Sequence, residues 1–168
     1  MIVYATGYRI LDFDRIDIRG VGGQSLAEAM GTAPKAFKGI ATPGFPNYFW
    51  GIGPNGLVLN VSYFRTAERN VKTIVDLIGK MENAGVGAVE VREDRTDSYF
   101  EWMKTQFGKF SWGEPGCTSY YTNAEGHAPF LFPGNFKEWM ALQEEIGLED
   151  FHARLQDRQR EDRSHRAG

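Results

Sequence analysis

Cysteine and long apolar runs are almost absent from this sequence. Its 168 residues include one cysteine, Cys117, so no disulfide can form within the chain and an intracellular setting is the simpler interpretation. No apolar stretch approaches the roughly 20 residues of a membrane-spanning helix. The first residues also lack the basic start and apolar centre of a signal peptide. We therefore expect a cytoplasmic protein with no membrane partner.

An excess of positive charge is missing as well. The formal net charge is −3, from 19 basic and 22 acidic residues, which gives no general attraction to a phosphate backbone. From His152 onward, arginines alternate with acidic residues and almost no apolar residue accompanies them. We expect no nucleic-acid partner, and we interpret residues 152–168 as a solvated helix end that frays into a disordered, charged tail.

Motifs for metal binding and nucleophilic catalysis are absent. The three histidines lie far apart, and no HExxH or CxxC pattern occurs, so we predict no metal site. There is no G-x-S-x-G elbow and no Walker-type phosphate loop. Cys117 has no base near it in the sequence, which favours a structural thiol. The glycines at 51–53 do not complete a GxGxxG dinucleotide fingerprint. We predict no catalytic residue.

What is present fits one packed domain of the α/β class. The hydrophobic fraction is 42% and the aromatic fraction 14%, enough for a core in a chain of this length. Apolar runs and turn residues predict strands at 1–6, 47–52, 86–91, 118–122 and 130–132, and helices at about 62–83, 93–106 and 136–146.

The helix at 62–83 has the clearest pattern. Asn60 or Ser62 is a suitable N-cap, and Gly85 is a suitable stop after the last turn. Apolar residues recur with the helical period and predict one buried face, made of Val71, Ile74, Val75, Ile78 and Met81.

A Gly-Pro-Asn-Gly turn at residues 53–56 joins the aromatic strand to this helix. The helix N-terminus then points back toward the strand end, and free amides with a positive dipole end can hold a polar or anionic ligand edge. A purely structural connection explains the turn equally well. For Asn55 a turn role and a ligand contact are both open.

Three motifs resemble the flavin-dependent monooxygenases of the Baeyer–Villiger type. The run VYATGYR at 3–9 resembles their ATG segment, and PGFPNYF at 43–49 followed by GPN at 53–55 resembles their GFPN…GPN signature. The run GCTSYY at 116–121, with FPG at 132–134, resembles their GC-x-SWY…WPG tail. Tyr120 and Phe132 stand where that family commonly has Trp.

The resemblance implies the C-terminal part of such an enzyme. The GxGxxG loops for FAD and NADPH are missing, and the chain opens inside a strand, so we expect a split gene, a misplaced start or a remnant. The implied fold is α/β, a C-terminal fragment of a flavoprotein with two dinucleotide-binding domains, followed by an α+β extension. Residues 1–85 would be the FAD-domain part, 86–151 the family-type extension, and 152–168 the tail.

The resemblance also implies a site. At Gly7 the chain would pass close to FAD. Gly53, Pro54 and Asn55 would form the turn beside the cofactor. Backbone amides at the flavin ring would come from Asn60, Val61, Ser62 and Tyr63. The substrate side would be lined by Leu57, Val58 and Leu59.

The function implied is that of an FAD- and NADPH-dependent monooxygenase that inserts oxygen from O2 into ketone-like organic substrates. We expect the chain alone to be inactive and to hold FAD weakly or not at all, because the NADPH site and the FAD phosphate loop are not in it. Its partners would be a small organic substrate and, as a separate chain, the missing N-terminal part. Two alternatives stay open: a non-catalytic remnant or binding module, and part of an N- or S-oxygenating flavin monooxygenase.

Overall fold

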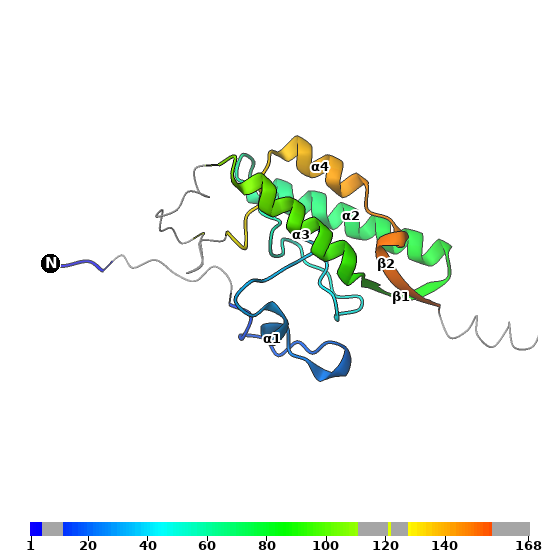
Figure 1. The fold of residues 1–168 in the computed structure, drawn as a ribbon. Helices are drawn as coiled ribbons and strands as arrows, with labels where there is room; N and C mark the ends of the chain where they lie inside the picture. Colours follow the sequence, from blue (N-terminus) through cyan, green and yellow to red (C-terminus); the bar gives the residue numbers. More distant parts are fainter. Residues whose placement is uncertain (5–11, 111–120, 122–127, 156–168) are drawn as a thin grey trace, which may run out of the picture.

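The computed structural model describes residues 1–4, 12–110, 121 and 128–155. In chain order the elements are η1 (Val21–Gly23), α1 (Leu26–Met30), α2 (Tyr63–Asn83), β1 (Val86–Val91), α3 (Glu93–Phe107), α4 (Phe136–Glu144), η3 (Leu148–Asp150) and β2 (Phe151–Leu155). Figure 1 shows α2, α3 and α4 in the body of the molecule, with α1 set to one side. None of these helices combines the length and the apolar character needed to cross a membrane.

The element α2 confirms the helix predicted over residues 62–83. Ser62 occupies the N-cap position, although its side chain makes no capping hydrogen bond. Gly85 follows the last turn with φ at 65° and donates its amide to the carbonyl of Glu82. This left-handed backbone is available to glycine without strain, which is why the helix ends there. The elements β1, α3 and α4 confirm the strand and the helices predicted after it.

The strands β1 and β2 form an antiparallel pair. Val91 pairs with Phe151 and Val86 with Leu155, with a shift of register near the start of β1. The prediction of a helix end and tail is therefore wrong for residues 152–155. A strand with one face in solvent also tolerates alternating charges, and of the β2 side chains only Phe151 is buried. Residues 156–168 lie outside the described part.

The predicted strands at 1–6 and 47–52 are also wrong where they are described. Residues 1–4 are exposed and have no regular structure, because no described strand pairs with them. In the aromatic segment, Phe49 makes only an isolated bridge. Asn47 has φ at 57°, which interrupts an extended run. The backbone of this segment bonds to loops, as where the Trp50 amide donates to a carbonyl of a preceding turn.

The two strands predicted at 118–122 and 130–132 have different outcomes. Residues 130–132 do not form a returning strand, since Leu131 makes only an isolated parallel bridge to Leu57. The run at 118–122, the motif at 116–121 and Gly7 lie outside the described residues, apart from Tyr121.

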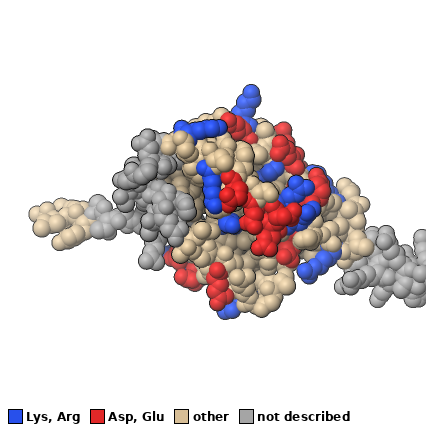
Figure 2. Space-filling model, in the orientation of Figure 1, with Lys and Arg blue, Asp and Glu red and all other residues tan. Residues whose placement is uncertain are grey.

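One hydrophobic core crosses the predicted boundary between residues 85 and 86. Its buried members come from the loop before the turn, from α2, from both strands, from α3 and from the segment after α4, and they are Phe37, Ile40, Ala41, Leu77, Met81, Val86, Val89, Val91, Tyr99, Phe100, Met103, Ile146 and Phe151. On the face shown in Figure 2, acidic and basic side chains are interspersed rather than sorted by sign.

The buried side of α2 is not the apolar side that the sequence predicts. Val71, Val75 and Ile78 are exposed, whereas of the predicted face Met81 is buried and Ile74 is half-buried against the core. The residues that α2 buries are instead Thr66, Asn70, Thr73, Leu77 and Met81. Buried polar side chains are stable where they form hydrogen bonds. The Thr73 hydroxyl, for example, donates to the Arg69 carbonyl, four residues earlier.

Candidate functional site

The turn at residues 53–56 is buried and tied to a later segment of the chain. Asn55 is 1% exposed and has φ at 61°, in the left-handed region that asparagine tolerates. Its backbone amide and its Nδ2 both donate to the carbonyl of Pro129, at 2.8 and 2.9 Å. The Tyr99 hydroxyl donates to the Asn55 carbonyl, and burial raises the pKa of Tyr99 so that it stays a neutral donor.

Glycines allow the backbone of this turn to pack against another loop. Gly39 has φ at 68°, and a Cβ at this position would lie 2.6 Å from the Cα of Gly56 and 2.9 Å from the Trp139 ring. The Gly53 amide donates to the Gly39 carbonyl at 2.9 Å. The turn is thus fixed from two sides, and it determines where the chain leaves for α2.

The three residues proposed to line a substrate differ in exposure. The Leu57 carbonyl accepts from the Phe132 amide at 2.8 Å, and the Leu57 side chain is half-buried. Val58 has no exposed surface and packs in a cluster with Phe132 and Trp139. Leu59 is exposed. Only Leu57 and Leu59 therefore offer surface to a ligand in this structure.

The N-terminus of α2 presents free donors, as the sequence suggests. The backbone amides of residues 60–64 have no hydrogen-bond partner among the described residues. Ser62 and Tyr63 are exposed and Val61 is half-buried. No acidic residue lies in the first turn of the helix, so the positive end of its dipole is not neutralised from within. An anionic or polar ligand edge fits these donors chemically.

The Asn60 side chain has a structural contact that the sequence does not reveal. Its Oδ1 accepts from the amide of Phe136, the first residue of α4, at 3.1 Å. The N-terminus of α4 is completed by a capping box between Asn135 and Glu138. Asn60 therefore links the starts of two helices through its Oδ1, so this oxygen is already engaged within the protein.

Asn70 is a second residue whose importance sequence reasoning misses. It is completely buried on α2 and donates through Nδ2 to the Gly51 carbonyl at 2.9 Å. Its Oδ1 accepts from Trp139 Nε1 at 3.0 Å. Asn70 thus connects α2 to α4 and to the chain just before the turn. Its position about two turns into the helix, among charged neighbours, gives no signal of burial.

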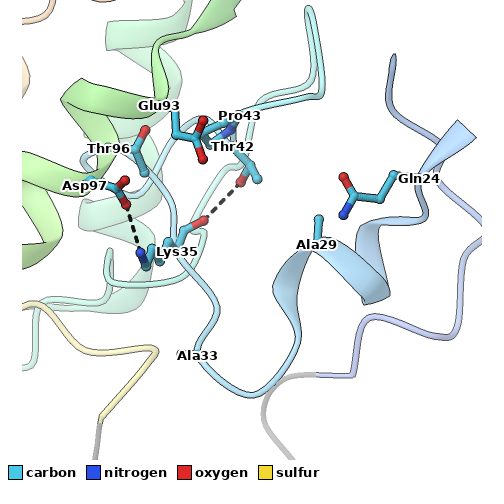
Figure 3. Close-up of a pocket in the computed structure, with 9 residues that line it drawn as sticks. All are labelled: Gln24, Ala29, Ala33, Lys35, Thr42, Pro43, Glu93, Thr96 and Asp97. Carbon is cyan, nitrogen blue, oxygen red and sulfur yellow. Dashed lines mark hydrogen bonds and ion pairs between the residues drawn. The ribbon is translucent and has the colours of Figure 1, made fainter. Parts of the chain in front are cut away.

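A separate cavity of about 270 Å³ lies between the α1 region and the start of α3 (Figure 3). Lys35 Nζ pairs with Asp97 at 2.8 Å across it, and the Thr42 hydroxyl donates to the Lys35 carbonyl. The Lys35 ammonium group and the Thr42 hydroxyl of this cavity are therefore already bonded within the protein. No residue predicted for the site lines this cavity.

Comparisons with known proteins show which enzymes this chain is similar to. No family model matches the sequence. A Baeyer-Villiger monooxygenase of Pseudomonas aeruginosa is 27% identical over 153 residues, which is 90% of this chain and 29% of the relative. The FAD-binding monooxygenase moxY of Dothistroma septosporum is 27% identical over 151 residues, 89% of this chain and 24% of the relative. A closed crystal structure of cyclohexanone monooxygenase superposes with a TM-score of 0.74 at 26% identity, covering 86% of this chain and 28% of that one.

The chain resembles a C-terminal portion of the Baeyer–Villiger-type flavin monooxygenases. It spans less than a third of the length of these relatives. Two further matches add a solved structure and a relative of a different name. A complex of OTEMO with FAD and NADP has a TM-score of 0.75 at 19% identity over 84% of this chain and 26% of that one, and so shares the fold. A phenazine N-monooxygenase of Lysobacter antibioticus is 32% identical over 101 residues, 59% of this chain and 18% of the relative.

Proposed function

We propose that this chain supplies the flavin-edge part of an FAD- and NADPH-dependent monooxygenase that inserts one oxygen atom of O2 into a ketone-like organic substrate. The free amides of residues 60–64 at the start of α2 carry the proposal, with the Baeyer–Villiger relatives in support. The corresponding architecture is part of a flavoprotein with two dinucleotide-binding domains. When bound, FAD takes two electrons from NADPH and passes them to O2, whose second oxygen leaves as water.

The contribution of this chain is electrostatic and positional. The free amides and the helix dipole stabilise negative charge on the edge of a reduced flavin ring, by about 0.3–1 kcal/mol when exposed and up to about 2 kcal/mol when partly buried. The buried turn at 53–56 holds these amides in place, and Gly7 would let the chain pass beside the ring. Leu57 and Leu59 give the neighbouring surface an apolar character that suits a soft organic substrate.

The test uses a hybrid in which this chain replaces the matched portion of the Pseudomonas aeruginosa relative. We expect NADPH-dependent oxygenation of a cyclic ketone and a flavin spectrum in the visible range. Tyr63→Pro removes one amide donor at the first helical position, where proline is tolerated, and Tyr63→Ala keeps that donor. The proline variant should lower the flavin midpoint potential relative to the alanine variant. Equal potentials would show that the Tyr63 amide does not face the ring, and a hybrid that holds FAD without turnover would favour a non-catalytic module.

The match to a phenazine N-monooxygenase specifically favours N-oxygenation as a second candidate. The same hybrid separates the two reactions when it is given a cyclic ketone and a nitrogen heteroaromatic in parallel. A lactone product supports the first proposal, and an N-oxide alone supports the second. In the hybrid, the nucleotide-binding part comes from the relative. The isolated chain should therefore show neither activity and should bind FAD weakly or not at all.

A further inference from the structure

A small cavity of about 190 Å³ lies between α2 and α4, the two helices that Asn70 and Trp139 join in the body of the molecule (Figure 1). None of the residues proposed to meet flavin or substrate lines it. The side chains that line it are Arg65, Glu68, Arg69 and Lys72 from α2, and Phe136 and Met140 from α4. Positions three and four residues apart share one side of a helix, so each helix contributes one row. We call this cavity the α2–α4 groove.

The α2–α4 groove is positively charged. Three of its lining side chains are cationic and one is acidic, which gives a local charge of +2 in a chain whose formal net charge is −3. Lys72 pairs with Asp76 at 2.7 Å, and the Arg65 guanidinium lies 5.9 Å from the centre of the Phe136 ring. A concave surface lined by an excess of one sign of charge attracts a ligand of the opposite sign.

Arg69 is poorly satisfied within the protein. Only 14% of its side chain is exposed, and its Nε is buried with no hydrogen-bond partner among the described residues. Its Nη2 lies 3.5 Å from the Met140 carbonyl and 3.6 Å from Glu144. Both distances exceed the roughly 2.7–2.9 Å of a charge-assisted hydrogen bond. A guanidinium in this state is stabilised by a planar anion that brings two oxygens to it, which is the geometry of a carboxylate.

The α4 side of the groove is apolar. Met140 is 36% exposed and the Phe136 ring, one turn earlier, is half-buried. An inorganic anion would use the cations and leave this surface in water, whereas a ligand with an aromatic or short aliphatic body covers it. Pockets for drug-sized ligands measure roughly 300–1,000 Å³. The groove is smaller, so it excludes a nucleotide and fits a body of about one ring.

We infer that the α2–α4 groove binds a small organic carboxylate. The carboxylate oxygens bond to Arg69 and Lys72, and the apolar body lies against Phe136 and Met140. Glu68 also lines the groove and disfavours a ligand with a second negative charge. This site does not depend on flavin chemistry, and its occupancy is measured without any oxygenase activity.

The test titrates the isotope-labelled full chain with benzoate and follows binding by NMR. We expect the amide signals of Arg69, Phe136 and Met140 to shift saturably, with a Kd of about 1 mM or lower. Benzamide offers the same ring without the charge, and inorganic phosphate offers charge without the ring. Each of these two probes should bind at least about tenfold more weakly than benzoate.

Variants locate the binding in the groove. Arg69→Gln should weaken benzoate binding at least about tenfold, and Arg69→Lys, which keeps the charge but loses the two-point geometry, should fall between it and wild type. Lys72→Gln should weaken binding about threefold. Lys137→Gln is the matched control, because it removes the same charge from an exposed position of α4 outside the groove, and it should bind as wild type does.

Four results would overturn the inference. They are no saturable shift up to about 10 mM benzoate, equal binding of benzoate and benzamide, equal binding of benzoate and phosphate, and equal binding of wild type and Lys72→Gln. Because Lys72 is exposed, Lys72→Gln keeps the fold and decides the question even where circular dichroism shows that Arg69→Gln unfolds.

Discussion

Replacing Asn70 by alanine should destabilise the protein by about 2–4 kcal/mol. The substitution leaves the Trp139 indole N–H, which is fully buried, without its acceptor at 3.0 Å, and an unsatisfied buried donor costs about 1–3 kcal/mol. It also removes the 2.9 Å bond to the Gly51 carbonyl, worth about 0.5–1.5 kcal/mol, with partial compensation from water because Gly51 is exposed.

The assay is urea unfolding followed by far-ultraviolet circular dichroism, which avoids dependence on tryptophan fluorescence. Asn83→Ala, at the exposed end of the same helix, is the control and should change the free energy of unfolding by less than about 0.5 kcal/mol. Trp139→Phe removes the donor instead. In the double mutant the two effects should be non-additive by about 1 kcal/mol or more. A loss below about 0.5 kcal/mol for Asn70→Ala, or strict additivity with Trp139→Phe, would refute the reasoning.

Two further predictions concern the turn region and pH. Gly39→Ala should lower the free energy of unfolding by about 2 kcal/mol or more, because the added Cβ would meet Gly56 and Trp139 at a left-handed φ. Gly79→Ala, where a Cβ in α2 meets no other atom, should raise it by up to about 1 kcal/mol. Thermal unfolding measures both effects, and a change of the same sign for the two variants would contradict the packing. Backbone and side-chain hydrogen bonds with Ser25 lower the pKa of Glu28 below its usual 4.5, so the stabilisation that Glu28 gives to α1 is complete above that value and is lost as pH falls through the folded pKa. The unfolding free energy of Glu28→Gln should therefore lie below that of wild type at pH 7 and converge with it in acid, and a pH-independent difference would exclude the capping role.

Local signals were sufficient for the helices and for β1. The helix α2 begins after Ser62 and ends before Gly85 because cap and stop residues act on the backbone within a few residues. The same holds for α4, whose Asn135–Glu138 capping box is legible in the sequence. Such signals do not depend on what lies on either side of the element.

Local signals failed where partners decide the structure. The aromatic segment at 47–52 has strand-forming residues, but Asn47 at positive φ and bonds to neighbouring loops prevent a ladder. Conversely, residues 152–155 look like a solvated helix end and become β2 because β1 offers an open edge. Strand formation needs a neighbour at long sequence distance, and a composition pattern does not contain that neighbour.

The candidate site shows the same division. The free amides at the start of α2 follow from the helix boundary alone, so they were predictable. The burial of Val58 and the cap that Asn60 provides for α4 depend on residues 130–136, far along the chain. The sequence leaves open whether the turn at 53–56 contacts a ligand or only connects two elements, and it does not reveal the bonds to Pro129 and Gly39 that fix the turn.

The side of α2 that is buried and the fixed position of the turn at 53–56 are related. Asn70 and Trp139 fix the polar side of the helix inward, and the turn at 53–56 fixes its origin, so the direction of α2 is set by this chain alone. Large apolar residues on another side of the helix, among them Phe64, Val75 and Ile78, are left exposed. A helix whose position is determined in this way holds its N-terminal amides in place.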